Sequence, residues 1–159
     1  MERDTIIFVC TGNTCRSPMA EALLRAALKK RAGGLEKLKV ASHGLAAHPG
    51  DAASTNSVKA MQRIGLDIRE HRSRALTQED LDRSCAVFGM TPGHLDALEQ
   101  RFESLPPHVL LLRDVLPEGV SREITDPFGG NYRVYEESRD SMIEAIPQML
   151  EFIKKNILT

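Results

Sequence analysis

Residues 10–18 read Cys-Thr-Gly-Asn-Thr-Cys-Arg-Ser-Pro, and the interpretation of the rest of the chain depends on them. They follow the apolar run Thr5–Val9, which predicts a buried strand, and precede Met19–Leu24, which predicts the opening of a helix. A loop between a strand end and a helix start is where α/β proteins bind phosphate, because free amide groups and the positive end of the helix dipole meet there. The stretch therefore predicts an anion site.

The residue types in this loop suit a phosphate cradle. Gly12 permits a tight turn, and Asn13 is one of the few residue types that tolerates a left-handed conformation. The guanidinium of Arg16 can close the ring by binding two phosphate oxygens at once. The phosphate-binding residues are expected to be Thr11, Gly12, Asn13, Thr14, Cys15, Arg16 and Ser17.

Cys10 is the candidate nucleophile. Amide groups and a nearby guanidinium favour the thiolate over the thiol, and a thiolate at the base of a phosphate cradle is placed to attack phosphorus. The alternative is a helix-capping loop in which Cys10 is a small buried hydrophobic residue. A spacing of five residues between a Cys and an Arg arises readily by chance, whereas the full string between a strand and a helix is far more specific.

The composition suits one domain spanning residues 1–159, with 42% hydrophobic residues. Lys and Arg number 21 against 22 Asp and Glu, a net charge of −1, so nothing favours nucleic acid or an anionic membrane as a partner. No apolar run approaches the roughly 20 residues of a membrane span. Residues 1–4 are charged, which predicts no signal peptide, and the three cysteines do not suggest secretion. We expect a cytoplasmic monomer with reduced thiols.

Strands alternate with helices along the chain. Beyond the first strand, strands are predicted at 38–41, 86–90 and 109–112, and helices at 17–31, 51–64, 92–102 and 132–157. Thr77 begins a predicted capping box for a further short helix, and segments 42–50 and 114–130 are predicted loops. The pattern predicts an α/β fold: a single three-layer domain with a four-stranded parallel sheet, helices on both faces and a phosphate-binding loop after the first strand.

The chain resembles the low-molecular-weight protein-tyrosine phosphatases. Their signature is Cys-x-Gly-Asn-x-Cys-Arg-Ser-Pro near the N-terminus and a late Asp-Pro, here Asp126-Pro127. Thr14 and the sequence Asp-Pro-Phe-Gly-Gly at 126–130 look most like the bacterial protein-arginine phosphatases, since tyrosine-specific members usually carry Ile at the position of Thr14. The resemblance covers nearly the whole chain. It implies a protein phosphatase that dephosphorylates phosphoarginine residues through a phosphocysteine intermediate, without a cofactor.

A general acid is needed to complete this chemistry, because attack by Cys10 expels a group that requires a proton. Asp126 is the candidate, since Pro127 restricts it to an extended conformation; the alternative is an ordinary Asp-Pro turn. Ser17 either donates a hydrogen bond to the Cys10 sulfur or caps the helix, and both roles are compatible. The predicted catalytic residues are therefore Cys10, Arg16 and Asp126.

Thr14 and Phe128 are expected to determine which phosphorylated side chain is accepted. Phosphotyrosine needs a deep slot with apolar or aromatic walls, whereas this chain has no Trp and two Tyr. In the family, residues 45–50 form one wall, and here they offer Leu, Ala, His and Pro in place of a large aromatic residue. Thr14 adds a hydroxyl, and Phe128 can stack on a guanidinium plane. These features favour phosphoarginine, and protein-tyrosine phosphatase is the alternative.

The predictions of loop-supporting residues and of redox chemistry depend on less specific sequence patterns. Asn13, Ser42, His71 and Ser73 form a candidate supporting set, and the family's hydrogen-bonded Asn, two Ser and His match Asn13, Ser17, Ser42 and His71. Spacing alone favours ordinary loop polarity for Ser42 and His71.

The resemblance also implies a reversible disulfide between Cys10 and Cys15, with a packed thiol at Cys15 as the alternative. Cys85 is expected in the core. The five histidines show no metal-ligand spacing, so no metal is expected.

Two other functions stay open. A thiol-dependent arsenate reductase would share the fold and a similar loop, but that chemistry needs a further pair of cysteines, and only Cys85 lies outside the loop. A phosphate-dependent binding or redox-sensing module has no need of a general acid, so the presence of Asp126 beside an intact nucleophile and cation argues against it.

Overall fold

The strand that leads into the loop lies inside the sheet. The structure, a computed structural model, describes residues 2–31 and 33–158, so the two ends of the predicted 1–159 domain lie outside the described residues. The sheet has four parallel strands in the order β2-β1-β3-β4, which confirms the predicted class. The strands are β1 (Thr5–Cys10), β2 (Lys39–Gly44), β3 (Ser84–Gly89) and β4 (His108–Leu111).

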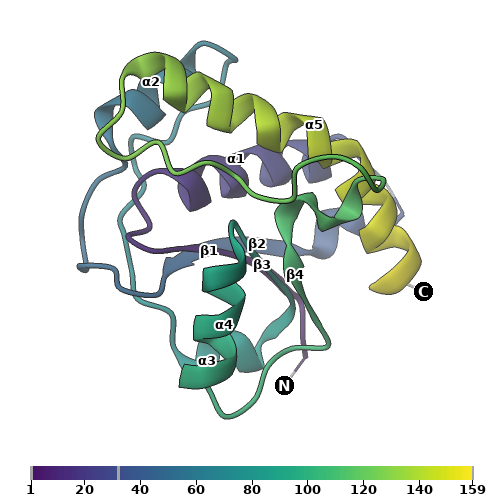
Figure 1. Cartoon of the computed structure of the whole chain (residues 1–159). Coiled ribbons are helices and arrows are strands. Elements are labelled where there is room, and N and C mark those ends of the chain that lie inside the picture. The colour runs from purple at the N-terminus through teal and green to yellow at the C-terminus, as the bar shows by residue number, and fades with distance from the viewer. Residues whose placement is uncertain (1, 32, 159) are drawn as a thin grey trace.

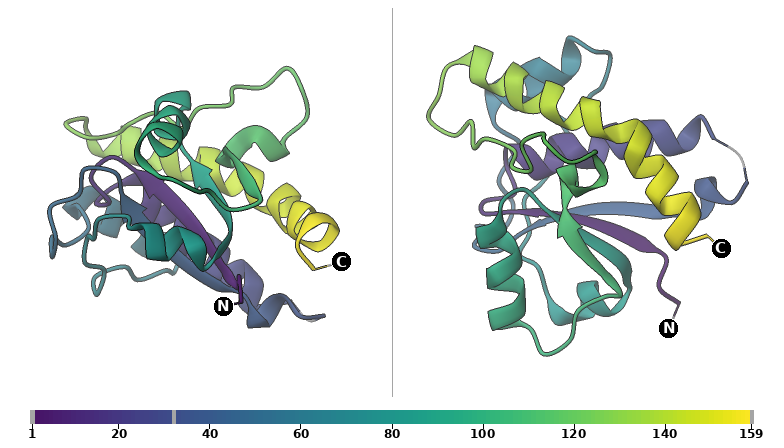
Figure 2. Two further views of the ribbon diagram at one scale, coloured as in Figure 1. Left: turned by 90° about the horizontal axis from the view of Figure 1, so that it is seen from below. Right: turned by 45° about the vertical axis from the view of Figure 1, so that its right-hand side comes forward.

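Helices cover both faces of this sheet. Figures 1 and 2 show α1, α2 and α5 on one side and α3 and α4 on the other. The first group comprises α1 (Arg16–Lys29), α2 (Thr55–Gln62) and α5 (Tyr132–Asn156), and the second comprises α3 (Gln78–Asp82) and α4 (Pro92–Arg101). Two short 3-10 turns, η1 (Leu35–Lys37) and η2 (Leu112–Val115), complete the elements. The arrangement is the predicted three-layer domain.

The alternation along β1 explains why the sheet is buried on both sides. Ile6 and Phe8 pack into the larger core beneath α1 and α5, whereas Ile7 and Val9 pack into the smaller core beneath α3 and α4. Successive side chains of a strand point to opposite faces, so an unbroken apolar run is what a doubly covered parallel strand requires. In the larger core Phe8 stacks on Phe88 of β3 with ring centroids 5.6 Å apart.

The predicted boundaries hold to within about two residues for most elements, but two predictions after the first helix are wrong. β2 continues to Gly44, three residues into the predicted loop, because pairing with β1 extends as far as Cys10 opposite Gly44. The helix predicted at 51–64 begins only at Thr55, since the Ser54 side chain accepts a hydrogen bond from the Ser57 amide and caps it there.

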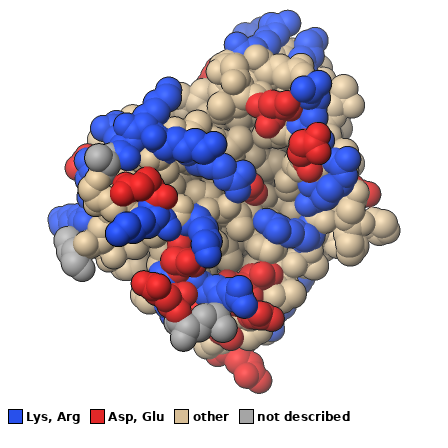
Figure 3. All heavy atoms as spheres, turned by 180° about the vertical axis from the view of Figure 1, so that it is seen from behind, with Lys and Arg blue, Asp and Glu red and all other residues tan. Residues whose placement is uncertain are grey.

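Charge is mixed on one face of the molecule. On the face seen in Figure 3, Lys and Arg side chains are interspersed with Asp and Glu, as expected for 21 basic and 22 acidic residues. Among the described residues, no helix combines the length and the apolar character needed to cross a membrane.

The end of β2 fits tightly under the loop, and this fit predicts the effect of a small substitution. A Cβ added at Gly44 meets Ala47 Cβ at 2.6 Å and the Thr11 carbonyl at 2.7 Å. Gly44→Ala is therefore expected to lower the free energy of unfolding by about 2 kcal/mol through overpacking, measured by urea denaturation. Gly93→Ala is the control, because its Cβ meets only Thr91 Oγ1 at 3.8 Å. Equal stability of the two variants would contradict the expected clash.

Candidate active site

The candidate active site lies at the carboxyl end of β1, at the left of Figure 1. Cys10 is the last residue of the strand and Arg16 is the first of α1, so five residues separate the candidate nucleophile from the helix. The first amide groups of a helix have no partner within it and present partial positive charge to whatever lies before them. Cys10 is 3% exposed, so its sulfur lies at the floor of the loop.

Asn13 determines the shape of the loop. Its φ angle is 58°, and it is the one non-glycine residue in the described chain with a positive φ. Its side-chain Nδ2 donates to Ser17 Oγ at 2.8 Å and to Ser42 Oγ at 3.0 Å, and its Oδ1 accepts from the Arg74 amide at 3.0 Å. Asn13 is fully buried, and these three bonds satisfy its amide group, so the left-handed turn is held from two other segments of the chain.

His71 completes the support of this turn. Its Nε2 donates to the Asn13 carbonyl at 2.7 Å, and because a carbonyl can only accept, Nε2 carries the hydrogen. Burial lowers the pKa of His71, partly offset by this hydrogen bond. The structure thus brings the predicted Ser42 and His71 onto Asn13. Ser73 instead accepts from the Asp51 amide and donates to the His48 carbonyl, so it holds the segment at 48–51.

The nucleophile has one close polar side-chain partner. Cys10 Sγ lies 2.9 Å from Ser17 Oγ. Because Ser17 Oγ already accepts a hydrogen bond from Asn13 Nδ2, its own hydroxyl hydrogen is free to point at the sulfur. A donor aimed at sulfur stabilises the thiolate relative to the thiol, so the buried network formed by Asn13 and Ser17 acts directly on Cys10.

Arg16 links the loop to the segment that carries the predicted acid. Its guanidinium donates from NH1 to the Ile124 carbonyl at 3.0 Å, and NH2 lies 3.6 Å from Asp126 Oδ2. The Arg16 side chain is 5% exposed and the Asp126 side chain 56% exposed. Asp126 Oδ1 also accepts from the Phe128 amide at 3.1 Å. The cation is thus fixed in position, while the carboxyl group faces solvent at the rim.

One cavity brings together the predicted catalytic and specificity residues and most of the predicted phosphate-binding residues, whereas Asn13 and Ser17 do not line it. It has a volume of about 250 Å³. Its lining residues are Cys10, Thr11, Gly12, Thr14, Cys15, Arg16, Asp126 and Phe128. Phe128 is 77% exposed, which leaves its ring free to cover a ligand. Residues 45–50, expected as a wall, are not among those lining it; Leu45 and Ala46 instead donate their amides to the carbonyls of Cys10 and Thr11.

The second thiol of the loop packs inward. Cys15 Sγ donates to Ser54 Oγ at 3.5 Å and lies 3.6 Å from the Tyr135 hydroxyl. All three cysteines are unpaired in the structure. Sequence reasoning missed Ser54 and Tyr135 because they lie far from the loop in the chain. A capping Ser and a Tyr on the buried face of the last helix gave no signal of a shared partner.

His94 is a further residue that sequence reasoning missed. Its Nδ1 accepts from the amides of Met90 and Thr91 at 3.2 and 3.3 Å. Nε2 must then carry the hydrogen, and it donates to Thr11 Oγ1 at 3.2 Å. Burial, and secondarily the charge of Arg16, lowers the pKa of His94 to about 4, so the ring is neutral near pH 7. The sequence signal was its place four residues after the third predicted strand.

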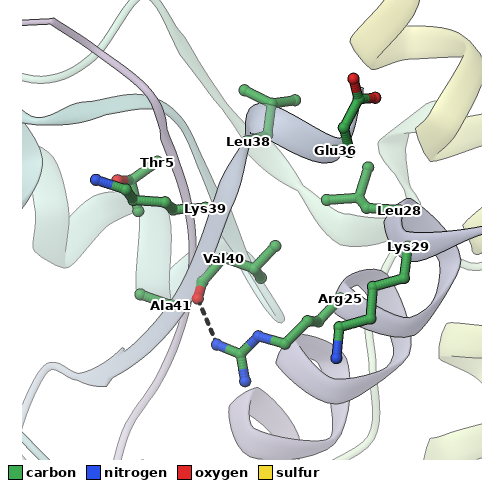
Figure 4. A pocket seen from close by; sticks show the side chains of 9 residues that line it. All are labelled: Thr5, Arg25, Leu28, Lys29, Glu36, Leu38, Lys39, Val40 and Ala41. Atoms are coloured by element: carbon green, nitrogen blue, oxygen red, sulfur yellow. Dashed lines mark hydrogen bonds between the residues drawn. The ribbon is translucent and has the colours of Figure 1, made fainter. Parts of the chain in front are cut away.

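The hollow at the opposite end of β1 lacks this chemistry. The hollow in Figure 4, about 480 Å³, lies at the opposite end of β1, where Thr5 and Lys39 begin their strands and Arg25 donates to the Val40 carbonyl. It contains no cysteine or histidine. Within the described residues no three His, Cys, Asp or Glu side chains gather in a way that could hold a metal ion.

The comparisons with known proteins agree with this geometry. The family model described as low molecular weight phosphotyrosine protein phosphatase matches residues 5–158. The chain belongs to this family. Members of this phosphatase family that match over most of their length include a protein-arginine-phosphatase of Geobacillus stearothermophilus, 38% identical over 92% of this chain and 93% of its own. A second protein-arginine-phosphatase, from Bacillus subtilis, is 36% identical over 95% of this chain and 97% of its own.

Solved structures of the low molecular weight phosphatase family share the fold. A mutant of the YwlE arginine phosphatase superimposes with a TM-score of 0.87 and 33% identity, covering 98% of this chain and 99% of that one. Proteins named low molecular weight protein-tyrosine-phosphatase and arsenate reductase are also among the relatives. Family membership makes this protein a cysteine-based phosphatase and leaves the phosphorylated side chain to be assigned.

The low pKa of His94 predicts a pH dependence of stability. The unfolded chain binds a proton at His94 below about pH 6.5, whereas the folded protein does so only near pH 4. Stability is therefore lost as the pH falls through this window, by up to about 3 kcal/mol at one residue. His94→Asn should lose less free energy of unfolding than the wild type between pH 7 and pH 4, measured by urea denaturation.

The control for this measurement is His48→Asn, because the His48 side chain is 83% exposed. It should lose as much stability as the wild type on acidification. Parallel pH curves for His94→Asn and the wild type would contradict a buried neutral ring at this position.

Proposed function

We propose that this protein is a cysteine-dependent protein-arginine phosphatase. The observation that carries the proposal is the convergence of Cys10, Arg16 and Asp126 on one cavity that Thr14 and Phe128 also line. A nucleophile, a fixed cation and a solvent-facing acid are the three groups that transfer of a phosphoryl group to sulfur needs. Relatives named protein-arginine-phosphatase support the choice of substrate.

In the first step the Cys10 thiolate attacks phosphorus. An S–P bond forms and the P–N bond to the substrate guanidinium breaks, while Asp126 transfers its proton to the departing nitrogen. The loop amides and Arg16 hold the three oxygens of the phosphoryl group, where charge develops in the transition state. The Ser17 hydroxyl, 2.9 Å from Cys10 Sγ, can donate a hydrogen bond to the attacking sulfur.

In the second step water releases the phosphate. Asp126, now a carboxylate, takes a proton from a water molecule whose oxygen attacks phosphorus, and the S–P bond breaks to return the thiolate. Ser17 stabilises that thiolate as it leaves. A solved arginine phosphatase of the same fold carries a phosphorylated serine in its active site, which supports a covalent phosphoenzyme at the equivalent point of this mechanism.

The ion pair between Arg16 and Asp126 suits a resting state that substrate replaces. A bound phosphate dianion offers Arg16 two oxygens in the plane of its fork, a better match than one exposed carboxylate at 3.6 Å. Asp126 is then released, takes up a proton from solvent and approaches the leaving nitrogen as the acid. The contact of Arg16 with the Ile124 carbonyl keeps the guanidinium directed at the loop during this exchange.

Phosphoarginine fits the rim residues better than phosphotyrosine does. Its guanidinium is planar and polar, so it can pair with Asp126 and lie against the exposed ring of Phe128. Thr14 presents a hydroxyl and a single methyl group to the cavity, where Ile would present a larger apolar side chain. Protein-tyrosine phosphatase with the same mechanism is the second candidate, because tyrosine-specific relatives share the fold.

Arsenate reduction is disfavoured by the position of the third cysteine. Cys85 is buried near the start of β3 and donates to the Thr5 carbonyl at the beginning of β1. Cys10 lies at the other end of β1, five residues and roughly 16 Å away. A disulfide relay between the two thiols therefore needs more than a side-chain movement.

The first test compares matched phosphoarginine and phosphotyrosine peptides, with Cys10→Ser as the blank. We expect kcat/KM to favour phosphoarginine at least tenfold, about 1.4 kcal/mol of transition-state discrimination. Thr14→Ile should erase the preference, because it removes the hydroxyl and narrows the cavity, while Thr14→Ser should retain it. The reverse preference would make this a tyrosine phosphatase, and activity on neither substrate by folded protein would favour a binding or redox module.

The second test concerns the acid. Asp126→Asn should lower kcat by about 10²- to 10⁴-fold, because the amide cannot protonate the leaving nitrogen. Asp96→Asn, at an exposed position on α4, is the control and should keep wild-type activity. If Asp126→Asn retained the wild-type kcat, Asp126 would not be the general acid.

We also propose that the protein is a cytoplasmic monomer. Three unpaired cysteines, one of them the nucleophile, suit a reducing compartment. Mass measurement by light scattering on the purified chain tests the monomer, and cell fractionation tests the location.

A further inference from the structure

A second hollow lies directly beside the catalytic cavity. It has a volume of about 450 Å³ and shares Thr11, Arg16 and Asp126 with that cavity. We call it the flank groove. One side is formed by residues after β3 and the other by the segment leading to α5, in sequence order Thr91 and His94, then Ser121, Glu123 and Thr125. Because three lining residues are common to both hollows, the flank groove adjoins the catalytic cavity.

The charge that faces the flank groove is negative. Among the lining residues that the structure describes, the cation is Arg16, whose guanidinium is already bonded to the Ile124 carbonyl and lies against Asp126. A substrate phosphate would occupy it further. His94 is neutral near pH 7. The carboxylate of Glu123, an exposed residue, is therefore the charge available to a ligand in the groove.

Most of the remaining residues that line the flank groove carry hydroxyls. Thr11 Oγ1 accepts a hydrogen bond from His94 Nε2, so its own hydrogen is directed elsewhere and can serve an acceptor on the ligand. Thr91, Ser121 and Thr125 add hydroxyls to the lining. Ile124 also lines the groove but is fully buried, so the surface is mainly polar and tolerates a hydrated polar chain.

A protein substrate carries residues on both sides of the phosphorylated one. Successive residues of an extended chain advance about 3.5 Å, so when the phosphorylated side chain enters the cavity its neighbours lie over the adjoining surface. The flank groove begins at Thr11 and Asp126, which border the phosphate site itself. It is therefore within reach of the first or second neighbour of the phosphorylated residue.

We infer that the flank groove binds the side chain of a residue next to the phosphorylated residue, and that Glu123 makes it prefer a cationic side chain, Lys or Arg. The inference rests on the proposed function insofar as the substrate is a phosphorylated protein. The ammonium group of Lys suits the groove because it stays largely hydrated while it pairs with an exposed carboxylate. Glu123 is thus a specificity-determining residue and takes no part in the chemical steps.

The experiment measures kcat/KM on phosphoarginine peptides that differ only in one flanking residue, Lys, Gln or Glu, at the two positions on either side. We expect Lys to exceed Glu at least threefold at one of these positions. Glu123→Gln should reduce the ratio to near one, and Glu123→Lys should invert it. Raising the salt from 0.1 M to 1 M should weaken the wild-type preference, because the screening length falls from about 10 Å to about 3 Å.

Two controls separate the groove from the chemistry. Glu118→Gln removes an exposed carboxylate of the same segment that does not line the groove, and it should keep the wild-type ratio. Free phosphoarginine has no flanking residues, so Glu123→Lys and the wild type should hydrolyse it at rates within twofold. A large loss on free phosphoarginine would place Glu123 in the catalytic machinery and overturn the inference.

The outcomes distinguish this inference from the proposed function. Equal kcat/KM for Lys and Glu at all four positions, with free phosphoarginine still hydrolysed, overturns the groove and leaves the proposed function standing. If phosphotyrosine proves to be the substrate, the same flanking series on phosphotyrosine peptides tests the groove independently. With phosphotyrosine peptides, a preference for Lys that Glu123→Gln abolishes supports the groove, and equal kcat/KM for Lys and Glu overturns it.

Discussion

The rest of the site depends on the hydrogen bonds that the side-chain amide of Asn13 makes. A phosphate cradle must curl back on itself within five residues, and that curl requires a left-handed residue where an ordinary side chain would be strained. Asn13 adopts it while fully buried because its amide bonds to Ser17, Ser42 and the backbone of Arg74. One of those bonds also orients the Ser17 hydroxyl toward Cys10. The same contact network therefore shapes the loop and contacts the proposed nucleophile.

The two halves of the chemistry come from distant parts of the chain, and Arg16 connects them. Its guanidinium touches the Ile124 carbonyl and lies near Asp126, so the residue proposed to bind phosphate also contacts the segment that carries the proposed acid. Burial differs along this connection, from a nearly inaccessible Arg16 to an exposed Asp126 and Phe128. A rigid floor under a more exposed rim is what phosphoryl transfer on a protein side chain requires, since the phosphate must be held while the rest of the substrate varies.

Prediction from the sequence succeeded for elements whose conformation is determined by residues close together in the chain. The apolar run of β1, the glycines and proline around the loop and the capping box at Thr77 each specify their own conformation, and the structure has the corresponding elements. It failed for β2 and α2. Residues 42–44 are polar or small and carry no strand pattern. They nevertheless pair with β1 as far as Cys10, and this pairing packs Gly44 closely under the Thr11 carbonyl of the loop. Residues 51–53 were predicted as the start of the helix, but Ser54 is its N-cap, so the helix begins only at Thr55.

By itself, the sequence determined the fold class and predicted the phosphate loop with its candidate nucleophile and cation, because an apolar strand, a left-handed Asn and a helix start are encoded within about fifteen consecutive residues. The candidate acid, Asp126, came from the late Asp-Pro motif of the family. The tertiary structure alone decided the contacts that join separate segments. The packing of Tyr135 on Cys15, the bond from His94 to Thr11, and the absence of residues 45–50 from the cavity wall depend on how β1, β3 and α5 are placed in space. No local pattern carries that information, since partners dozens of residues apart meet only once the sheet has formed.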